Sequence, residues 1–200
     1  MINFVQELFS YGFIIRAFIA GSLIALCAAL LGVILVLKRY SMIGDGLSHV
    51  GFGTMAIAMA FNFAPLAVSI PICVLAAFLL LRVSSSSNIK GDAAIALISS
   101  SSLAIGILVT SLTSGLNTDV TSFMFGSILA ISKADLIVSV ILAVVVVSLF
   151  VIFYNKIFLV TFDENFARAT GVKVNVYNMI IAFLTAIIIV LGMKLMGSLL

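Results

Sequence analysis

The chain has 200 residues, of which 64% are hydrophobic and only 8% are charged. A soluble globular domain carries about 25% charged residues, so this composition excludes a soluble domain and predicts an integral membrane protein. The net charge of +3 comes from ten basic and seven acidic residues, which are too few and too scattered for a nucleic-acid-binding surface.

Long uncharged runs separated by short charged segments predict an all-α, polytopic transmembrane helical bundle. The first run, residues 17–37, would be about 31 Å long as a helix, which matches a hydrocarbon core of roughly 30 Å. Residues 46–81 are too long for one crossing, so we expect two helices there, joined by a tight turn at residues 62–65. The polar residues 82–92 predict a short flexible loop.

The second half of the chain continues this pattern. Residues 93–118 and 136–155 predict a fourth and a fifth span, and the apolar run that reaches Leu200 predicts a sixth. Residues 120–132 are too few to cross and predict a short interfacial helix. We therefore expect about six spans in one transmembrane domain, residues 1–200, and we expect that domain to be incomplete at its C-terminus because the chain stops inside an apolar run.

The basic residues predict how the chain is oriented. If the first five spans alternate in direction, one side of the membrane receives Lys38, Arg39, Arg82, Lys90, Lys156, Arg168 and Lys173. The other side receives mainly Arg16 and Lys133. Because loops rich in Lys and Arg stay inside, the first side is predicted to be cytoplasmic and the N-terminus to lie outside.

The segment SMIGDGLSHVGFG, residues 41–53, carries an acid and the only histidine of the chain within strongly apolar sequence. Asp45 and His49 are four residues apart, so a helix would present both on one face, where they could hold a divalent cation. Ionisable groups at membrane depth are costly and are therefore candidates for function. The alternative is structural: Asp45 would cap the helix start and His49 would hydrogen-bond a neighbouring helix. The spacing alone leaves both interpretations open.

The loop after the fifth span contains a second signal. Thr161 and Glu164 have the spacing of a capping box, with Asp163 adding favourable charge, and Gly171 is suited to closing the helix. Phe162, Phe166 and Ala169 would share one face of this short helix. So short a helix needs a partner surface. That surface is either the membrane domain or lipid headgroups, or it belongs to a cytoplasmic motor that docks there.

Five segments resemble the membrane permease subunits of bacterial zinc and manganese ABC transporters in order and spacing. They are GVILVLKRYSMIGDGLSHVGFGTMAIA, GDAAIALISSSSLAIGILVTSL, DVTSFMFGSILAIS, TFDENFARATGVKV and LGMKLMGSLL. The resemblance covers essentially the whole chain, and a basic pair followed by GDGLSH is its most specific part. Val50-Gly51-Phe52-Gly53 stands where manganese-type members usually carry Leu-Pro, which makes the sequence more similar to the zinc type.

The resemblance implies an ABC importer for divalent metal ions, most similar to those for zinc, in which this chain forms the gated pathway. It implies a homodimeric permease in the bacterial cytoplasmic membrane, a pair of cytoplasmic ATP-binding subunits and an extracytoplasmic metal-binding protein. Asp45 and His49 match the metal-pathway residues. The segment FDENFARATG matches the helix that couples to the ATPase, with Phe162, Asp163, Glu164, Phe166, Ala167 and Gly171 as its candidate residues.

The chain contains no glycine-rich phosphate-binding loop ending in Gly-Lys-Ser or Gly-Lys-Thr, so ATP hydrolysis is expected on a partner chain and no enzyme active site is predicted. No permanently bound cofactor is expected, and zinc or manganese would be the transported ion. One acid and one histidine are too few for a tight tetrahedral site, but a pathway must also release its ion. Two alternatives stay open: an ATP-independent secondary metal transporter or channel, and a non-conducting membrane subunit.

Overall fold

The computed structural model describes residues 11–40, 42–86, 91–113, 125–126 and 133–197, and these residues form an all-α bundle without a strand. The all-α prediction is therefore confirmed. The helices, in chain order, are α2 (Gly12–Leu37), α3 (Ile43–Ala60), α4 (Pro65–Ser86), α5 (Gly91–Thr113), α7 (Lys133–Phe162), α8 (Glu164–Ala169) and α9 (Val174–Met196).

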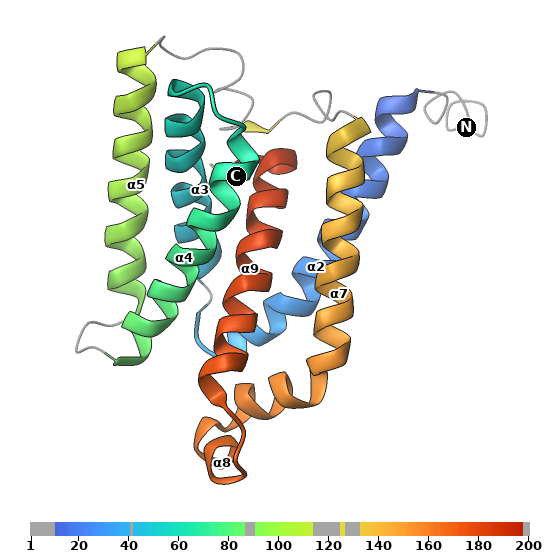
Figure 1. The fold of residues 1–200 in the computed structure, drawn as a ribbon, viewed down its shortest axis with the longest axis vertical. Coiled ribbons are helices and arrows are strands. Elements are labelled where there is room, and N and C mark those ends of the chain that lie inside the picture. Colours follow the sequence, from blue (N-terminus) through green and yellow to red (C-terminus); the bar gives the residue numbers. More distant parts are fainter. Residues whose placement is uncertain (1–10, 41, 87–90, 114–124, 127–132, 198–200) are drawn as a thin grey trace.

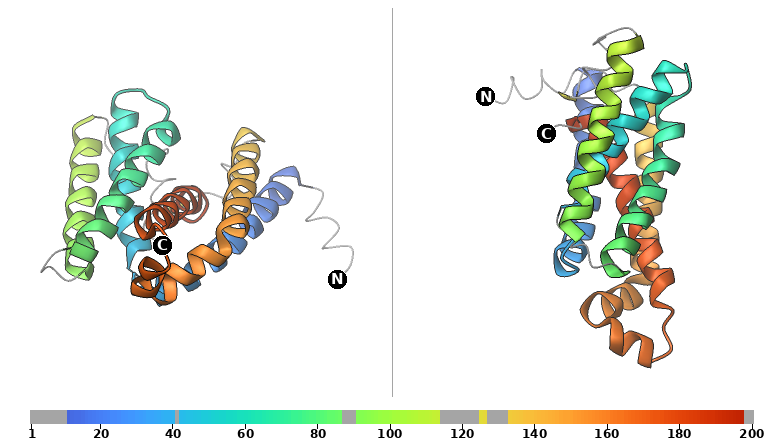
Figure 2. Two further views of the ribbon diagram at one scale, coloured as in Figure 1. Left: turned by 60° about the horizontal axis from the view of Figure 1, so that its bottom comes forward. Right: turned by 90° about the vertical axis from the view of Figure 1, so that its left-hand side faces the viewer.

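The long helices alternate in direction, and α9 lies between two groups of them (Figure 1). On one side α3 packs against α4 and α5, and on the other α2 packs against α7. The short helix α8 lies at the lower end, below the rest of the bundle (Figures 1 and 2). In α9, 56% of the most apolar stretch is buried, compared with 17–28% in the other long apolar helices, so α9 is the centre of the fold.

Two hydrophobic clusters meet at α9. The first joins α3, α4, α5 and α9 and includes Leu47, Phe52, Cys73, Ile95 and Val190. The second joins α2, α7 and α9 and includes Cys27, Leu31, Val146, Phe150 and Leu184. Because each cluster takes side chains from α9, the two groups of helices are held together by apolar packing against a common helix.

Five described helices are long and apolar enough to cross a membrane: α2, α4, α5, α7 and α9. The sequence predicts about six spans, and α3 is the one that does not meet this criterion. Its glycines, together with Asp45 and His49, lower its hydropathy, and α4, α5 and α9 pack around it. A helix that is enclosed by other helices needs less apolar surface of its own than a helix that faces lipid.

Several helix ends differ from the predicted ones. The predicted loop over residues 82–92 is largely helical, because α4 continues to Ser86 and α5 begins at Gly91. The fifth span was expected to end at Asn155, but α7 continues to Phe162 and is about 45 Å long, more than a bilayer core requires. The predicted interfacial helix over residues 120–132 lies outside the described residues except for Phe125 and Gly126.

The turn predicted at residues 62–65 is confirmed. Asn62 has a positive φ of 56°, and the backbone N–H of Phe63 donates to the carbonyl oxygen of Ala58 at 2.8 Å. A left-handed residue followed by this hydrogen bond is the Schellman arrangement that ends many helices. Pro65 then begins α4, where its missing N–H leaves no helical hydrogen bond unmade.

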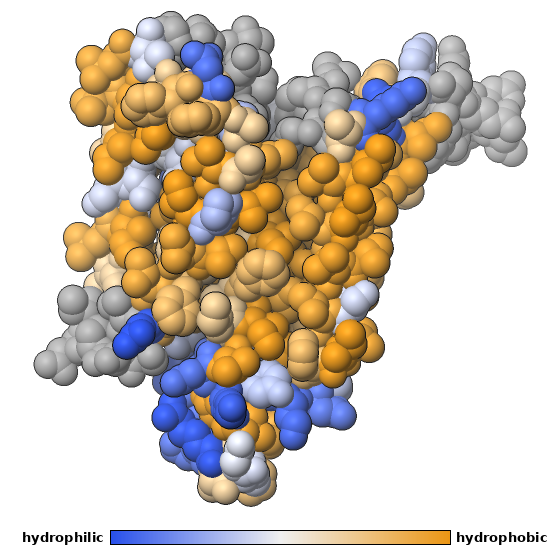
Figure 3. Space-filling view, in the orientation of Figure 1, coloured by the Kyte–Doolittle hydropathy of each residue, from blue (hydrophilic) through white to orange (hydrophobic). Residues whose placement is uncertain are grey.

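The distribution of basic residues agrees with the predicted alternation. Lys38, Arg39, Arg82, Lys156, Arg168 and Lys173 all belong to segments at the lower end of the bundle, whereas Arg16 and Lys133 lie at the upper end. Hydrophilic residues gather around α8 at the lower end, while the sides of the bundle are apolar (Figure 3). The lower end is therefore the cytoplasmic end by the positive-inside rule.

Candidate functional site

The position of α3 depends on three glycines. An added Cβ on Gly46 would lie 2.6 Å from Ile95, on Gly51 2.6 Å from Met193, and on Gly53 2.7 Å from the carbonyl oxygen of Ser102. A side chain at Gly53 would meet the backbone of α5 and push α3 away from it, whereas opposite Gly51 the contact is the end of the flexible Met193 side chain, which can move aside. Small residues at these positions let the neighbouring helices approach α3 closely. Gly44 has no neighbour within 4 Å of the added atom.

Asp45 and His49 lie on one face of α3, as their spacing predicts. Nε2 of His49 is 3.5 Å from Oδ1 of Asp45. The Asp45 side chain is 59% exposed and that of His49 14% exposed, so the carboxylate is open to a ligand while the imidazole is largely enclosed. The buried Nδ1 of His49 has no hydrogen-bond partner among the described residues.

The structural alternative gives Asp45 a role at the helix start and His49 a hydrogen bond to a neighbouring helix. The N-cap of α3 is Met42, without a capping side-chain hydrogen bond, and Asp45 lies in the first turn of the helix, three residues after it. Its charge there still favours the helix N-terminus. Among the described residues, no neighbouring helix takes a hydrogen bond from Nδ1 of His49. The pair is thus a carboxylate and an imidazole with coordination capacity that the described residues leave unused.

The described residues contain no cluster of three or more His, Cys, Asp and Glu side chains that could hold a metal ion. Asp45 and His49 therefore form at most part of a coordination shell. A Mn²⁺ or Zn²⁺ ion there would need further ligands from water or from another chain. The hydroxyl group of Ser48 donates to the carbonyl oxygen of Asp45 at 2.8 Å, so it is already engaged within α3.

The short loop helix exists, but its predicted N-cap is wrong. Asp163 is the N-cap of α8, and its side chain accepts a hydrogen bond from the backbone N–H of Phe166 at 2.9 Å. Thr161 still belongs to α7, where its hydroxyl donates to the carbonyl oxygen of Ile157. The hydroxyl is satisfied within its own helix, which leaves the carboxylate to cap the next one. Gly171 has a φ of 80° and ends the helix as predicted.

The predicted docking residues other than Glu164 fall into three groups. Phe162 and Phe166 are 61% and 55% exposed and present apolar surface at the lower end of the bundle. Ala167 is fully buried and packs with Val160 of α7 and Val174 of α9. Asp163 and Gly171 shape the two ends of α8. One side of α8 is therefore anchored to the bundle, and aromatic side chains remain uncovered.

Glu164 makes contacts that the sequence analysis does not identify. Its Oε1 accepts hydrogen bonds from Nζ of Lys38 at 2.8 Å and from Nδ2 of Asn178 at 3.1 Å, and Lys38 also donates to Oδ1 of Asn178 at 2.6 Å. Burial alone would raise the pKa of Glu164, but these hydrogen bonds and the charges of Lys38 and Arg168 outweigh it, so the pKa is lowered. No local pattern could reveal a contact between residues 126 positions apart.

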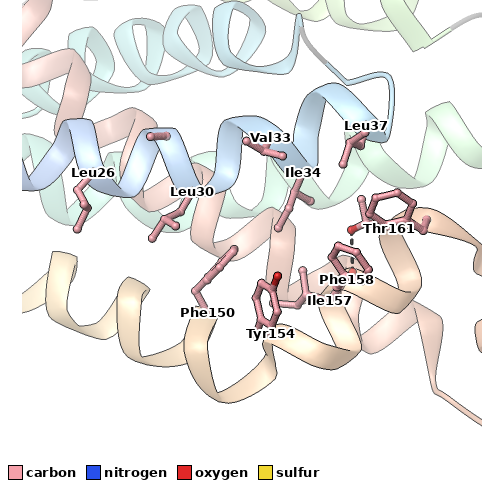
Figure 4. Close-up of a pocket in the computed structure, with 12 residues that line it drawn as sticks. Leu26, Leu30, Val33, Ile34, Leu37, Phe150, Tyr154, Ile157, Phe158 and Thr161 are labelled. Carbon is pink, nitrogen blue, oxygen red and sulfur yellow. Dashed lines mark hydrogen bonds between the residues drawn. The ribbon is translucent and has the colours of Figure 1, made fainter.

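A groove of about 390 Å³ lies between α2 and α7 (Figure 4). Leu26, Leu30 and Ile34 of α2 face Phe150 and Tyr154 of α7 across it. Its lining contains no charged side chain and neither Asp45 nor His49. The groove is therefore apolar, and its lining supplies no metal ligand.

Comparison with known proteins gives the family. Residues 10–200 match the model of the ABC 3 transport family. The manganese import system permease protein ScaB of Streptococcus gordonii is 30% identical over 198 residues, 99% of this chain and 71% of that protein. The manganese transport system membrane protein MntC of Halalkalibacterium halodurans is 27% identical over 194 residues, 97% of this chain and 66% of that protein.

Among solved structures, PsaBC from Streptococcus pneumoniae in complex with Fab matches with a TM-score of 0.85 and 28% identity. The match covers 100% of this chain and 72% of that chain. This chain thus spans about two thirds to seven tenths of the length of its relatives. Five of the described helices are suited to crossing a membrane. The chain belongs to the ABC 3 transport family and is a non-enzymatic, multi-pass permease subunit of the bacterial cytoplasmic membrane.

Proposed function

We propose that this chain forms the membrane pathway of an ABC importer for a divalent metal ion, with Asp45 and His49 contacting the ion. The observation that carries the proposal is the pair itself, a carboxylate and an imidazole 3.5 Å apart on α3, with a buried Nδ1 that has no hydrogen-bond partner in the part of the chain that the structure describes. Unused coordination capacity of this kind suits a site that binds its ion only in passing.

The remaining ligands would come from water and from a second copy of the permease. Asp45 is open enough to turn toward a ligand outside the chain. In a two-fold symmetric homodimer whose axis faces α3, two Asp45 and two His49 side chains would supply four ligands. A shell completed by two chains opens when the chains move apart, which allows the ion to leave.

Zinc and manganese are the two candidate cargoes. Imidazole with carboxylate suits zinc, whereas manganese accepts more oxygen ligands. The relatives ScaB and MntC are both named for manganese. We therefore take manganese as the first cargo to test and zinc, which the sequence favoured, as the second.

Cytoplasmic ATP-binding subunits would supply the energy, and an extracytoplasmic metal-binding protein would deliver the ion to the upper end. The exposed side chains of Phe162 and Phe166 at the cytoplasmic end fit an apolar pocket on an ATP-binding subunit. The anchored side of α8 would transmit a movement of that subunit to the bundle.

The test is uptake of radioactive manganese and zinc by bacterial cells that lack their own transporters for these metals and express this chain with both partners. We expect His49→Ala and Asp45→Ala to abolish uptake at wild-type membrane abundance. Ser101→Ala is the matched control, because the exposed hydroxyl group of Ser101 donates within its own helix, α5, to the carbonyl oxygen of Leu97. It should transport normally.

The outcomes separate the alternatives. Undiminished uptake by His49→Ala and Asp45→Ala would remove these residues from the pathway. Uptake that persists without the ATP-binding subunit would indicate a secondary transporter or channel. A wild-type chain that supports no uptake of either metal would favour a non-conducting subunit.

A further inference from the structure

Lys38 is a buried cation that neither metal contact nor ATPase docking explains. Its side chain is only 5% exposed, although it lies at the polar cytoplasmic end of the bundle. A buried ammonium group is tolerated only when it is paired and hydrogen-bonded. Lys38 meets this requirement through Oε1 of Glu164 at 2.8 Å and Oδ1 of Asn178 at 2.6 Å.

These three side chains join three elements. Lys38 follows the last residue of α2, Glu164 is the first residue of α8, and Asn178 lies in the second turn of α9. Asn178 closes the triangle by donating to Glu164 at 3.1 Å. The apolar contacts of Ala167 hold the other side of α8. If α8 moves relative to α2, either Lys38 moves with it or a partly buried ion pair breaks.

Lys38 is also close in sequence to the candidate metal ligands. Only residues 38–42 separate α2 from α3, and Asp45 lies in the first turn of α3. Backbone hydrogen bonds tie Tyr40 to Leu35 of α2 at 2.8 Å and Ile43 to Tyr40 at 3.0 Å. Ile43 is buried in the core cluster that holds α3. Tyr40 is therefore hydrogen-bonded both to the end of α2 and to the start of α3, which ties the two helices together.

We propose that the Lys38–Glu164–Asn178 cluster is the mechanical link by which movement of α8 reaches Asp45 and His49. Lys38 is a positioning residue that acts through Glu164 and touches neither the metal nor the ATP-binding subunit. The inference rests on the proposed function, because it gives α8 a route to the candidate metal site. Within this chain alone, the cluster controls the environment of His49.

The first measurement uses the full chain in lipid nanodiscs, purified with a tag that contains no histidine. Because His49 is the only histidine, selective isotope labelling yields a single imidazole NMR signal. We expect Lys38→Met to shift this signal and Glu164→Gln to shift it similarly. The double variant should add no further shift, since both changes cut one connection. Arg168→Gln is the control: it removes a cation 3.9 Å from the other carboxylate oxygen of Glu164 and leaves the link intact.

The second measurement uses the complex with its partners in proteoliposomes and records metal uptake and ATP hydrolysis together. Lys38→Met should lower the uptake per ATP hydrolysed by roughly fivefold or more, the scale of a coupling free energy between two sites. A merely structural defect would lower both rates in proportion and leave their ratio unchanged. Arg168→Gln should keep the wild-type ratio.

The results distinguish this inference from the proposed function. An unshifted His49 signal in Lys38→Met, or a wild-type ratio of uptake to hydrolysis, overturns the link even where the wild type transports metal. A wild-type complex that moves no metal contradicts the proposed function, and the NMR measurement on the chain alone then still decides whether the cluster controls His49.

Discussion

Single residues set how closely α3 approaches its neighbours. Gly53 faces the carbonyl oxygen of Ser102, and Gly106 faces the ring of Phe52 and the Cα of Gly53, so α3 and α5 approach each other closely. Asp45 and His49 are close to each other because of helix geometry, whereas Asp45 stays exposed and the enclosure of His49 depends on the packing of α3. Their side-by-side position is confirmed, while their metal contact stays a prediction.

We expect Gly53→Ala to destabilise the fold by about 1–3 kcal/mol, because the new Cβ would meet backbone that cannot move aside easily. Gly44→Ala is the matched control on the same helix, since nothing lies within 4 Å of its added atom. Alanine favours a helix over glycine by up to about 1 kcal/mol, so the control should be neutral or stabilising. Thermal unfolding in detergent compares the two. Equal stabilities would contradict the close approach of α3 to α5.

At the scale of elements, α8 has two unlike sides. Ala167 and Glu164 attach it to the bundle, while Phe162 and Phe166 stay exposed next to it. The sequence predicted a short helix that needs a partner surface, and its own membrane domain supplies part of that surface. Whether an ATP-binding subunit covers the exposed part stays a prediction.

Phe166→Asp should detach the ATP-binding subunit. It replaces apolar contact surface with a charge, and the loss of such an interface anchor costs about 2 kcal/mol or more, roughly a 30-fold weaker complex. Since Phe166 is exposed, the fold itself should tolerate the change. Co-purification from membranes measures the loss, and Phe166→Leu, which keeps apolar surface, should retain binding. A Phe166→Asp chain that binds as well as the wild type would argue against docking at α8.

At the scale of the whole molecule, the distribution of basic residues and the directions of the helices indicate the same orientation in the membrane. Most of the described basic residues belong to segments at the lower end, and the turn between α3 and α4 lies at the other end (Figure 1). This arrangement assigns the lower end to the cytoplasm and the turn at residues 62–65 to the outside.

Cysteine labelling checks this orientation, because both native cysteines are buried. A membrane-impermeant maleimide should label Ala64→Cys on intact cells, since Ala64 is exposed in the turn between α3 and α4. Asn175→Cys, exposed near the start of α9, should react only after the cells are permeabilised. The reverse pattern would invert the orientation and place α8 outside the cell, where no ATP-binding subunit could reach it.

The sequence by itself determined the features that depend on composition or on residues close in the chain. The membrane class follows from 64% hydrophobic residues, the turn at Asn62 from local backbone preferences, and the Asp45–His49 pair from a four-residue helical spacing. Only the tertiary structure decided that α9 is central and that Lys38 is buried against Glu164 and Asn178. It also decided that Asp163, not Thr161, caps α8. Burial and long-range pairing depend on which helices meet, and a local pattern does not contain that information.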